Sequence, residues 1–502
     1  MSCTATSSCM TVRAHTRIII VGTGFSGLGA AIRLRQEGIN DFLLLERASD
    51  LGGTWRDNSY PGCACDVPSR LYSFSFAQNS EWSRSYSAQP EIWAYLKRVA
   101  AAHSLEPFIR YGCVLTGALW DDRAKQWNLE TTAGPMSASV LVLATGAQSE
   151  PLMPKLPGLD SFGGVTFHSA RWRHDYDLTG KRVAVIGTGA SAIQFVPAIQ
   201  PHVAMLHLFQ RTAPWVVPRR DRALSERELA IYRAVPGLRQ LARGLLYATR
   251  EATVLAFRHP KAAALLERIA RMHLTAQVSD PLLREKLTAN FAFGCKRVLV
   301  ANDYYPALTK PNVELVTDAI REIEPRGVIT HDGRLREVDA IVLGTGFRPT
   351  DPPLAPHITG RDGRTLAQAW TPSMRAYAST TVSGFPNLFV VPGPNAGIGH
   401  TSLIYMIESQ LSHVVSAVQF MTAAGVSAME PRAEAQADYA AAIDERMRGT
   451  VWTAGGCQSW YIDGSGRNSV LWPDFTFRFR RRVAHMNPNH YVLTYSSTPT
   501  AT

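Results

Sequence analysis

Two stretches of the chain share one order of hydrophobic and polar positions. The first, RIIIVGTGFSGLGAAIRLRQEG at residues 17–38, has a β-branched run, a glycine-rich turn and then alanine and leucine at helical spacing. A second apolar run, DFLLLE, follows at residues 41–46. The other stretch is RVAVIGTGASAIQFVPAIQ at residues 182–200, followed by AMLHLFQR at residues 204–211. This order predicts two strand–turn–helix–strand units with parallel strands.

The turn in each unit carries a G-x-G-x-x-G/A pattern, in which small residues let the backbone approach a pyrophosphate at a helix N-terminus. One such pattern is weak evidence, but two with the expected strands on both sides are strong evidence for dinucleotide binding. The six positions are Gly22, Gly24 and Gly27 in the first unit and Gly187, Gly189 and Ala192 in the second.

The two units end their second strands on opposite charges at equal spacing. Glu46 lies 19 residues after Gly27, and Arg211 lies 19 residues after Ala192. A carboxylate at this position accepts hydrogen bonds from a ribose diol, whereas an arginine pairs with a 2′-phosphate. Either charge alone is also an ordinary surface residue at a strand end. As a pair they predict FAD or NAD in the first site and NADPH in the second, and hence a flavoenzyme.

Length and charge add limited information. With 502 residues and 46% hydrophobic residues, the chain is expected to form several globular domains. The formal charge of +11 is scattered, so it favours phosphate-bearing cofactors over nucleic acid. The densest basic run, Arg478 to Arg482, is expected to be a solvated edge. No signal peptide or uncharged apolar run long enough to span a membrane is expected.

The cysteines indicate a reducing, cytoplasmic compartment. They form no CxxC pair, their odd number argues against a complete disulfide framework, and no CxxxxC redox pair of a disulfide reductase is present. The seven are Cys3, Cys9, Cys63, Cys65, Cys113, Cys295 and Cys457.

Residues 221–290 are rich in alanine, leucine and arginine at helical spacing and are predicted to be a helical insertion. Packed amphipathic helices are the simplest interpretation; a pocket lining or a membrane-surface contact are alternatives. The expected class is α/β with two Rossmann-like domains. The predicted segments are 1–150 (FAD domain, first part), 151–220 (NADP domain, first part), 221–290 (insertion), 291–348 (NADP domain, second part) and 349–502 (FAD domain, second part).

Several motifs together resemble those of Baeyer–Villiger monooxygenases, flavin- and NADPH-dependent enzymes that insert oxygen beside a ketone carbonyl. The pattern Phe162-x-Gly164-xxx-His168-xxx-Trp172 resembles the family fingerprint, although Arg173 replaces the expected proline or aspartate and is typical of the N- and S-oxygenating relatives. The other motifs are GGTWRDNSYPGCACD (52–66), FGCKRVL (293–299), LGTGF (343–347) and the block at 450–476.

The resemblance implies roles for two charged residues. Arg297 is expected to stabilise a deprotonated C4a-peroxyflavin and then the tetrahedral adduct, because a guanidinium stays charged and presents fixed donors. Asp66 is expected to hold Arg297 in place. Alternatives are that Arg297 pairs with a cofactor phosphate and that Asp66 caps a loop. We interpret Phe162, Gly164, His168 and Trp172 as a hinge coupling the nicotinamide to the flavin site, with His168 not the catalytic base.

The turn GPNAGIGHTS, residues 393–402, precedes a long predicted helix whose N-terminal dipole is expected to face the flavin; capping by Thr401 or Ser402 is an equal alternative. The full set of predicted cofactor contacts is Gly22, Gly24, Phe25, Ser26, Gly27, Glu46, Arg47, Gly53, Thr54, Trp55, Asp66, Gly187, Thr188, Gly189, Ala190, Ser191, Ala192, Gln194, Arg211, Thr212, Lys296, Gly393 and Pro394.

The sequence therefore predicts an FAD- and NADPH-dependent monooxygenase that converts a ketone and O2 to an ester or lactone, as a monomer or small homo-oligomer. An N- or S-oxygenating relative and an NADPH–flavin reductase are the alternatives, and no metal is expected. The aromatic residues Trp452, Trp460, Tyr461 and Trp472 suggest an apolar substrate that is cyclic, aromatic or long-chain.

Overall fold

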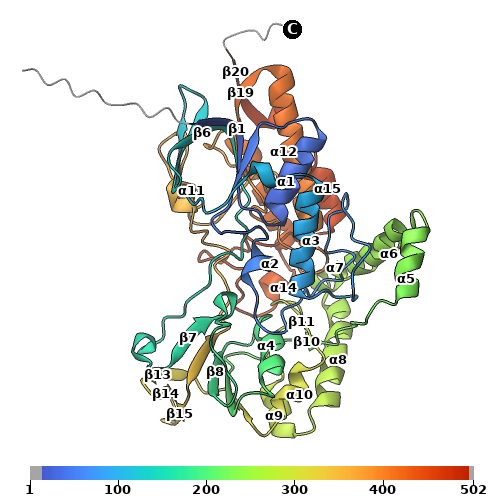
Figure 1. The fold of residues 1–502 in the computed structure, drawn as a ribbon, viewed down its shortest axis with the longest axis vertical. Coiled ribbons are helices and arrows are strands. Elements are labelled where there is room, and N and C mark those ends of the chain that lie inside the picture. The colour runs from blue at the N-terminus through green and yellow to red at the C-terminus, as the bar shows by residue number, and fades with distance from the viewer. Residues whose placement is uncertain (1–13, 497–502) are drawn as a thin grey trace, which may run out of the picture.

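A computed structural model describes residues 14–496 and folds them into two α/β lobes, one above the other in Figure 1. The upper lobe is built from the two ends of the chain, and the lower lobe from its middle. The predicted class, with two Rossmann-like sheets, is confirmed. The exact segment boundaries stay a prediction.

The upper lobe contains an eight-stranded mixed sheet in the order β17-β4-β5-β6-β1-β2-β3, with β18 also paired to β6. Helices cover β1, so Ile18, Ile19 and Ile20 are fully buried, as expected for a central parallel strand. Val21 pairs with Leu45, which brings Gly22 and Glu46 to the same sheet edge. The strands are β1 (Ala14–Val21), β2 (Phe42–Leu45), β3 (Ile109–Arg110), β4 (Leu115–Asp121), β5 (Gln126–Thr131), β6 (Met136–Leu143), β17 (Ile358–Thr359) and β18 (Leu388–Val390).

The lower lobe contains a five-stranded parallel sheet in the order β12-β9-β8-β16-β7. Ile186 pairs with Phe209, so the second glycine-rich turn and Arg211 also meet at one edge. The strands are β7 (Val165–His168), β8 (Arg182–Ile186), β9 (Met205–Phe209), β12 (Val313–Val316) and β16 (Ala340–Leu343). Three short sheets complete the fold: β10 (Val216–Val217) with β11 (Leu299–Val300), β13 (Ile320–Glu324) with β14 (Gly327–Thr330) and β15 (Leu335–Glu337), and β19 (Val426–Pro431) with β20 (Tyr491–Tyr495).

Helices from both ends of the chain cover the upper sheet. The 22-residue helix α12 (Leu403–Ala424) packs closely on α1 (Phe25–Gln36), and a Cβ on Gly29 would lie 2.7 Å from the Leu411 side chain. The other helices of this lobe are α2 (Thr54–Asp57), α3 (Gln89–Ala102), α11 (Leu366–Ala369), α13 (Ala433–Met447), α14 (Val451–Ala454) and α15 (Thr476–Val483). The lower sheet carries α4 (Ala192–Ile199) and α10 (Tyr304–Leu308).

The region predicted as an insertion consists of five helices, of which α5 and α6 project to the side of the two lobes (Figure 1). On α6 the side chains of Leu241 and Leu245 are exposed. The five are α5 (Glu226–Ala234), α6 (Leu238–Ala252), α7 (Val254–Arg258), α8 (Pro260–Gln277) and α9 (Pro281–Lys286).

The chain crosses between the lobes twice, at residues 144–164 (the first crossing) and at residues 344–357 (the second crossing). The two crossings are hydrogen-bonded to each other. Leu152 N donates to Gly346 O at 2.8 Å, and Thr345 Oγ1 donates to Leu152 O at 2.6 Å. This pairing places LGTGF beside the linker that leaves β6.

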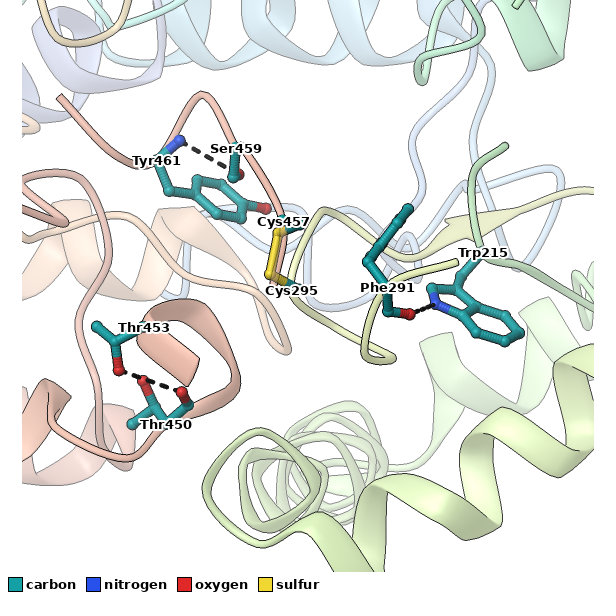
Figure 2. Close-up of a disulfide and its surroundings, with 8 residues drawn as sticks. All are labelled: Trp215, Phe291, Cys295, Thr450, Thr453, Cys457, Ser459 and Tyr461. Atoms are coloured by element: carbon teal, nitrogen blue, oxygen red, sulfur yellow. Dashed lines mark hydrogen bonds between the residues drawn. A yellow bond between two sulfur atoms is a disulfide. The ribbon is translucent and has the colours of Figure 1, made fainter. Parts of the chain in front are cut away.

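The cysteines show one pairing that the sequence analysis did not anticipate. Cys295 and Cys457 form a disulfide (Figure 2), whereas Cys63, Cys65 and Cys113 are free and buried. An odd count excludes only a complete framework, not a single pair. Cys3 and Cys9 lie outside the described residues.

The described residues bear on two predictions, one about the basic run at residues 478–482 and one about membrane-spanning helices. The basic run 478–482 lies on the helix α15 rather than on an edge, with its arginines exposed and Phe479 buried beneath them. Between residues 14 and 496, helices with the length and apolar character needed to cross a bilayer are absent.

Candidate active site

The first glycine-rich turn lies where β1 ends and α1 begins. Gly22 has φ +107°, and a Cβ there would lie 2.6 Å from the Ala144 carbonyl oxygen. A Cβ on Gly27 would lie 1.8 Å from the Gly22 oxygen. The N-cap Gly24 leaves the first N–H groups of α1 without a side-chain partner. The turn therefore has the space and the donors that a pyrophosphate needs.

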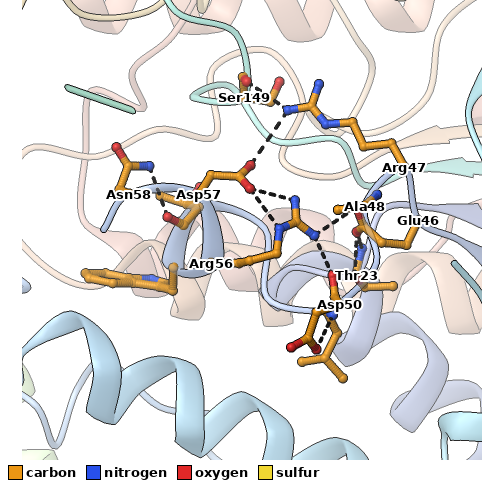
Figure 3. Close-up of polar contacts among 12 residues, drawn as sticks. Thr23, Glu46, Arg47, Ala48, Asp50, Arg56, Asp57, Asn58 and Ser149 are labelled. Carbon is orange, nitrogen blue, oxygen red and sulfur yellow. Dashed lines mark hydrogen bonds and ion pairs between the residues drawn. The ribbon is translucent and has the colours of Figure 1, made fainter. Parts of the chain in front are cut away.

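Glu46 is buried at the edge of the upper sheet, beside this turn (Figure 3). One of its carboxylate oxygens accepts from Thr23 N at 3.2 Å and from the Thr23 hydroxyl. The other accepts from Ala48 N at 2.9 Å and lies 2.9 Å from Arg56 Nη1. A buried carboxylate held in this way at the end of the second strand is the residue type that binds a ribose diol in dinucleotide-binding folds.

The other residues predicted near the FAD turn differ in whether their side chains are buried or paired within the protein. Gly53 lies against Gly24, since a Cβ on Gly53 would be 3.1 Å from the Gly24 Cα. Trp55 is buried and donates to the Tyr72 hydroxyl at 3.1 Å. The side chain of Arg47 instead pairs with Glu150 and donates to Ser149 O at 3.1 Å, which attaches it to the first crossing (Figure 3). Phe25 and Ser26 are buried in the first turn of α1, and Thr54 begins α2.

The second glycine-rich turn has the same construction at the end of β8. Gly187 has φ +110°, and a Cβ there would lie 2.4 Å from the Gly344 oxygen. Gly189 and Ala190 are exposed, and Ser191 is the N-cap of α4 without a side-chain hydrogen bond to the helix. The turn is therefore open to a ligand at its tip.

Gln194, predicted as a cofactor contact, instead joins the two lobes. Its side-chain oxygen accepts from Ala64 N at 2.9 Å, and its amide nitrogen donates to Ala64 O at 3.2 Å. Both ends of the amide are therefore occupied by the backbone of the upper-lobe loop that carries Asp66.

Two cations lie close to the second turn. Arg211 is exposed directly after β9, and Thr212 O accepts from the Thr188 hydroxyl at 3.2 Å. Lys296 is near enough to Arg211 for their charges to interact, and its pKa is lowered first by burial and then by Arg211. Its ammonium lies 4.9 Å from the ring centre of Phe291. Two adjacent cations suit a phosphate dianion.

Arg297 joins three segments of the chain. Its Nε and Nη2 donate to Asp66 Oδ2 at 3.0 and 2.7 Å, and its Nη1 donates to Ile398 O at 3.2 Å. Burial lowers the pKa of Arg297, but the charge and hydrogen bonds of Asp66, together with Tyr461 and Cys65, outweigh burial, so the net pKa is raised. The guanidinium is therefore charged at any working pH, is fixed in orientation and retains an N–H for another acceptor.

The segment from Phe162 to Trp172 connects the first crossing to the helix after the second glycine-rich turn and, through that helix, to the upper lobe. Gly164 must be glycine, because a Cβ there would lie 2.4 Å from the Asp339 oxygen. Trp172 packs on Phe195 of α4 with ring centres 5.4 Å apart, and Phe195 packs on Tyr60 of the upper lobe at 6.0 Å. Phe162 packs on the lower sheet.

His168 lies buried at the end of β7, edge-on to Phe347 of the second crossing with ring centres 5.9 Å apart. Its Nδ1 accepts from Ala170 N at 3.1 Å. Burial lowers its pKa to about 4, so the ring is neutral near pH 7. The hydrogen bond to Ala170 and the packing on Phe347 hold the ring of His168 in place at the end of β7.

The turn before α12 is tightly packed. A Cβ on Gly393 would lie 2.2 Å from Ser379 O, and the next residue, Pro394, is buried. Ser402, one of the two predicted capping residues, is the N-cap of α12 and accepts from Ile404 N at 3.3 Å.

Comparison with known proteins agrees with this geometry. Residues 19–227 match the family model described as pyridine nucleotide-disulphide oxidoreductase. A Baeyer–Villiger monooxygenase of Streptomyces coelicolor is 51% identical over 96% of this chain and 93% of its own length. One of Pseudomonas aeruginosa is 47% identical over 97% of this chain and 93% of its own.

The chain belongs to the Baeyer–Villiger monooxygenases. It is an FAD- and NADPH-dependent flavoprotein monooxygenase that inserts one oxygen atom of O2 beside a ketone carbonyl to give an ester or lactone. The N- or S-oxygenating and reductase alternatives are not favoured.

Solved structures support the same assignment. The closed structure of cyclohexanone monooxygenase matches with a TM-score of 0.88 and 29% identity over 97% of this chain and 100% of that one. Oxidized steroid monooxygenase bound to NADP matches with a TM-score of 0.83 and 31% identity over 96% and 100%. The two-lobed scaffold is therefore shared with a solved cyclohexanone monooxygenase and a solved steroid monooxygenase.

Sequence reasoning did not assign Arg56 to the site, and it named Tyr461 only as a pocket aromatic. Arg56 pairs with Glu46, and Tyr461 is buried close enough to Arg297 and Asp66 for their charges to act on its hydroxyl. Burial is the main cause that raises the pKa of Tyr461 to about 12. Arg56 follows Trp55 directly in the GGTWRDN motif, so its position was available as a signal, whereas Tyr461 gave none beyond its aromatic character.

The aromatic residues suggested for the substrate pocket divide into two groups. Trp452, Tyr461 and Trp472 are buried in hydrophobic clusters, and Trp472 packs on Phe479 of α15. Trp460 alone of the four is well exposed, at 44%. The surface available to a ligand in this loop is therefore smaller than its aromatic content suggests.

Proposed function

We propose that Arg297 is the catalytic cation of this monooxygenase and that Asp66 positions it. The single observation that carries the proposal is the contact of both donors, Nε and Nη2, with one carboxylate oxygen of Asp66. That contact fixes the plane of the guanidinium and leaves part of Nη1 for a substrate or cofactor oxygen.

Bound FAD, once reduced by NADPH, supplies the activation of dioxygen. Arg297 holds the negative charge that develops on oxygen during transfer to the carbonyl carbon. A preorganised cation in a half-buried site does this without solvent reorganisation. Asp66 orients the guanidinium and removes part of its charge, so the pair acts as one positioned donor. The Ile398 carbonyl, in the turn before α12, fixes the third nitrogen.

FAD is held by the first turn, with Glu46 at the ribose and the N–H groups of α1 at the pyrophosphate. NADPH is held by the second turn, with Arg211 and Lys296 at the 2′-phosphate. The packing of Gly22, Gly27 and Gly187, each of which excludes a Cβ, supports these assignments.

The substrate is proposed to be an apolar ketone, cyclic, aromatic or long-chain, taken up beside Arg297 near the loop that carries Trp460. The structural relatives named for cyclohexanone and steroid oxidation support this class. The protein is further proposed to act in the cytoplasm as a monomer or small homo-oligomer.

The test is oxygen transfer from labelled dioxygen. The FAD-loaded enzyme is incubated with NADPH, 18O2 and a panel containing cyclohexanone, a steroid ketone and a long-chain ketone. An ester or lactone with one labelled oxygen atom, formed by wild type and lost in Arg297→Ala, is expected. Ester formation that survives in Arg297→Ala would assign the cation's role to another group.

A further inference from the structure

The disulfide joins the segment that carries Arg297 to the loop that carries Trp460 and Tyr461. Cys295 lies two residues before Arg297, and Cys457 lies three residues before Trp460. The two cysteines are 162 residues apart in the sequence and their Cα atoms are 6.2 Å apart (Figure 2). One covalent bond therefore ties the C-terminal loop to the lower-lobe side of the active site.

Few other contacts hold this part of the loop in place. Ala292 N donates to Gly455 O at 3.1 Å, and a Cβ on Gly455 would lie 2.9 Å from the Cys295 Cβ, so the two segments touch there. Beyond Gly455, the hydrogen bonds of residues 456–460 are local in the described chain, such as Tyr461 N to Ser459 Oγ at 3.3 Å (Figure 2). For residues 456–460 the disulfide is thus the main link to the segment of Arg297, whereas the next residue, Tyr461, is buried in a hydrophobic cluster.

The two sulfur atoms differ in access. Cys295 is buried among Trp215, Phe291 and Phe293, whereas Cys457 is half-buried in a loop that turns through Gly456 at φ +70°. We expect an external thiol to attack from the side of Cys457, the less buried of the two residues, because thiol–disulfide exchange depends on access.

We propose that Cys295 and Cys457 form a reversible redox site that controls how firmly the loop covers Arg297. Closed, the bond holds residues 456–460 against the segment of Arg297; open, it releases them. The proposal rests on the proposed role of Arg297, since the loop matters through the site that it covers.

The redox chemistry is balanced by species that the activity produces. When NADPH and O2 are consumed without oxygen transfer to a ketone, the products are NADP⁺ and hydrogen peroxide. One peroxide oxidises the two thiols: the S–S bond forms, the O–O bond breaks and two water molecules leave. In reverse, a dithiol reductant attacks Cys457 through a mixed disulfide, closes its own disulfide and leaves two protonated thiols on the protein. Hydrogen peroxide from unproductive turnover would thereby close the disulfide, and the closed loop would limit further release of peroxide.

The test compares the FAD-loaded enzyme after air oxidation, after treatment with dithiothreitol, and after re-oxidation with hydrogen peroxide. Alkylation and mass spectrometry report the state of the two cysteines. Chymotrypsin reports the loop, because it cuts after aromatic residues and Trp460 is 44% exposed. With cyclohexanone present, peroxide released per NADPH consumed reports the active site.

Reduction is expected to free both thiols, to speed cleavage at Trp460 several-fold and to raise the peroxide yield several-fold, and re-oxidation should reverse all three. Cys457→Ser should behave as the reduced enzyme with or without dithiothreitol. Cys113→Ala removes a buried free cysteine of the upper lobe and should respond as wild type does.

Free thiols at both positions in the air-oxidised enzyme would overturn the proposal. So would reduction that leaves cleavage at Trp460 and peroxide yield unchanged. Cleavage and thiol readouts need no ketone turnover. Faster cleavage with unchanged peroxide yield would therefore refute control of the active site by the loop, while leaving the role of Arg297 to its own test.

Discussion

The guanidinium of Arg297 donates two hydrogen bonds to a single carboxylate oxygen of Asp66, although 231 residues separate them in the sequence. Asp66 belongs to the upper lobe and Arg297 to a segment leading into β11. A third contact, to Ile398 O, reaches the turn before α12. A guanidinium held this way depends on the correct docking of the lobes and on both halves of the upper lobe.

Replacing Arg297 by alanine is expected to lower ketone conversion about 10²–10³-fold, the usual cost of losing one preorganised donor to developing negative charge. Reduction of FAD by NADPH should continue, with the electrons released as hydrogen peroxide. Ester formation and anaerobic flavin reduction are measured in parallel. Arg478→Ala, which removes an exposed arginine of α15, is the control, and an equal loss of both activities in Arg297→Ala would indicate misfolding instead.

Replacing Asp66 by asparagine keeps the shape of the side chain but removes its charge. The guanidinium then loses its fixed orientation, and we expect a loss in kcat of about 10–100-fold, as is usual for groups that orient a functional residue. The KM for NADPH should stay near that of wild type. Steady-state kinetics at saturating ketone with NADPH varied measure kcat and the KM for NADPH separately, and unchanged kcat would show that Asp66 only caps its loop.

Arg211→Ala and Lys296→Ala are expected to raise the KM for NADPH about tenfold or more, since each removes a charged partner of the 2′-phosphate. NADH lacks that phosphate, so its KM should change little. Arg321→Ala, an exposed arginine of β13 paired with Glu322, is the matched control. A parallel rise for NADH and NADPH would show that these cations support the fold rather than the phosphate.

Glu46→Gln is expected to weaken FAD binding about tenfold, because the neutral amide accepts a ribose hydrogen bond poorly and removes one of the two carboxylates paired with Arg56. The ratio of bound flavin to protein after dialysis measures the effect. Glu37→Gln, at an exposed pair with Arg33, should keep its flavin. Full flavin retention in Glu46→Gln would place the ribose elsewhere.

The stability of the protein is expected to fall on acidification between pH 6.5 and about 4. Burial lowers the pKa values of His168 and His413 to about 4, below the ordinary value of 6.5. In this window the unfolded chain binds protons at both histidines while the folded chain does not, so each contributes a loss of up to about 1.4 kcal/mol per pH unit. Their stabilising effect is fully present above pH 6.5.

Thermal unfolding of the FAD-loaded enzyme at pH 7.5, 6.5, 5.5 and 5.0 measures this. A flat Tm between pH 7.5 and 6.5 followed by a decline is expected. An unchanged Tm at pH 5.0 would mean that these rings are protonated in the folded state.

Local pattern was sufficient for the two nucleotide-binding units. Gly22, Gly187 and the strands before them are set by short-range geometry, since a tight strand–helix turn accepts only residues without a side chain. The charges Glu46 and Arg211 could also be assigned, because parallel strand ends meet at one edge once the units are recognised. The pair Asp66–Arg297 was expected only through the resemblance to known monooxygenases.

Where side chains pair across the lobes, the sequence was a poor guide. Gln194 was expected at the cofactor and instead holds the Ala64 backbone, and Arg47 binds Glu150 of the first crossing. Trp472 was expected at a pocket and packs in the core on Phe479. The partners of Gln194 and Arg47 lie more than 100 residues away in the sequence, so no local spacing records them.

By itself, the sequence determined the fold class, the two dinucleotide turns, the charge at each strand end and the family to which the chain belongs. Only the tertiary structure decided that Arg297 is held by Asp66 and Ile398, that His168 packs on Phe347, and that Cys295 is joined to Cys457. The physical reason is range: turn geometry and strand register act over a few residues, whereas these contacts exist only after the lobes have docked.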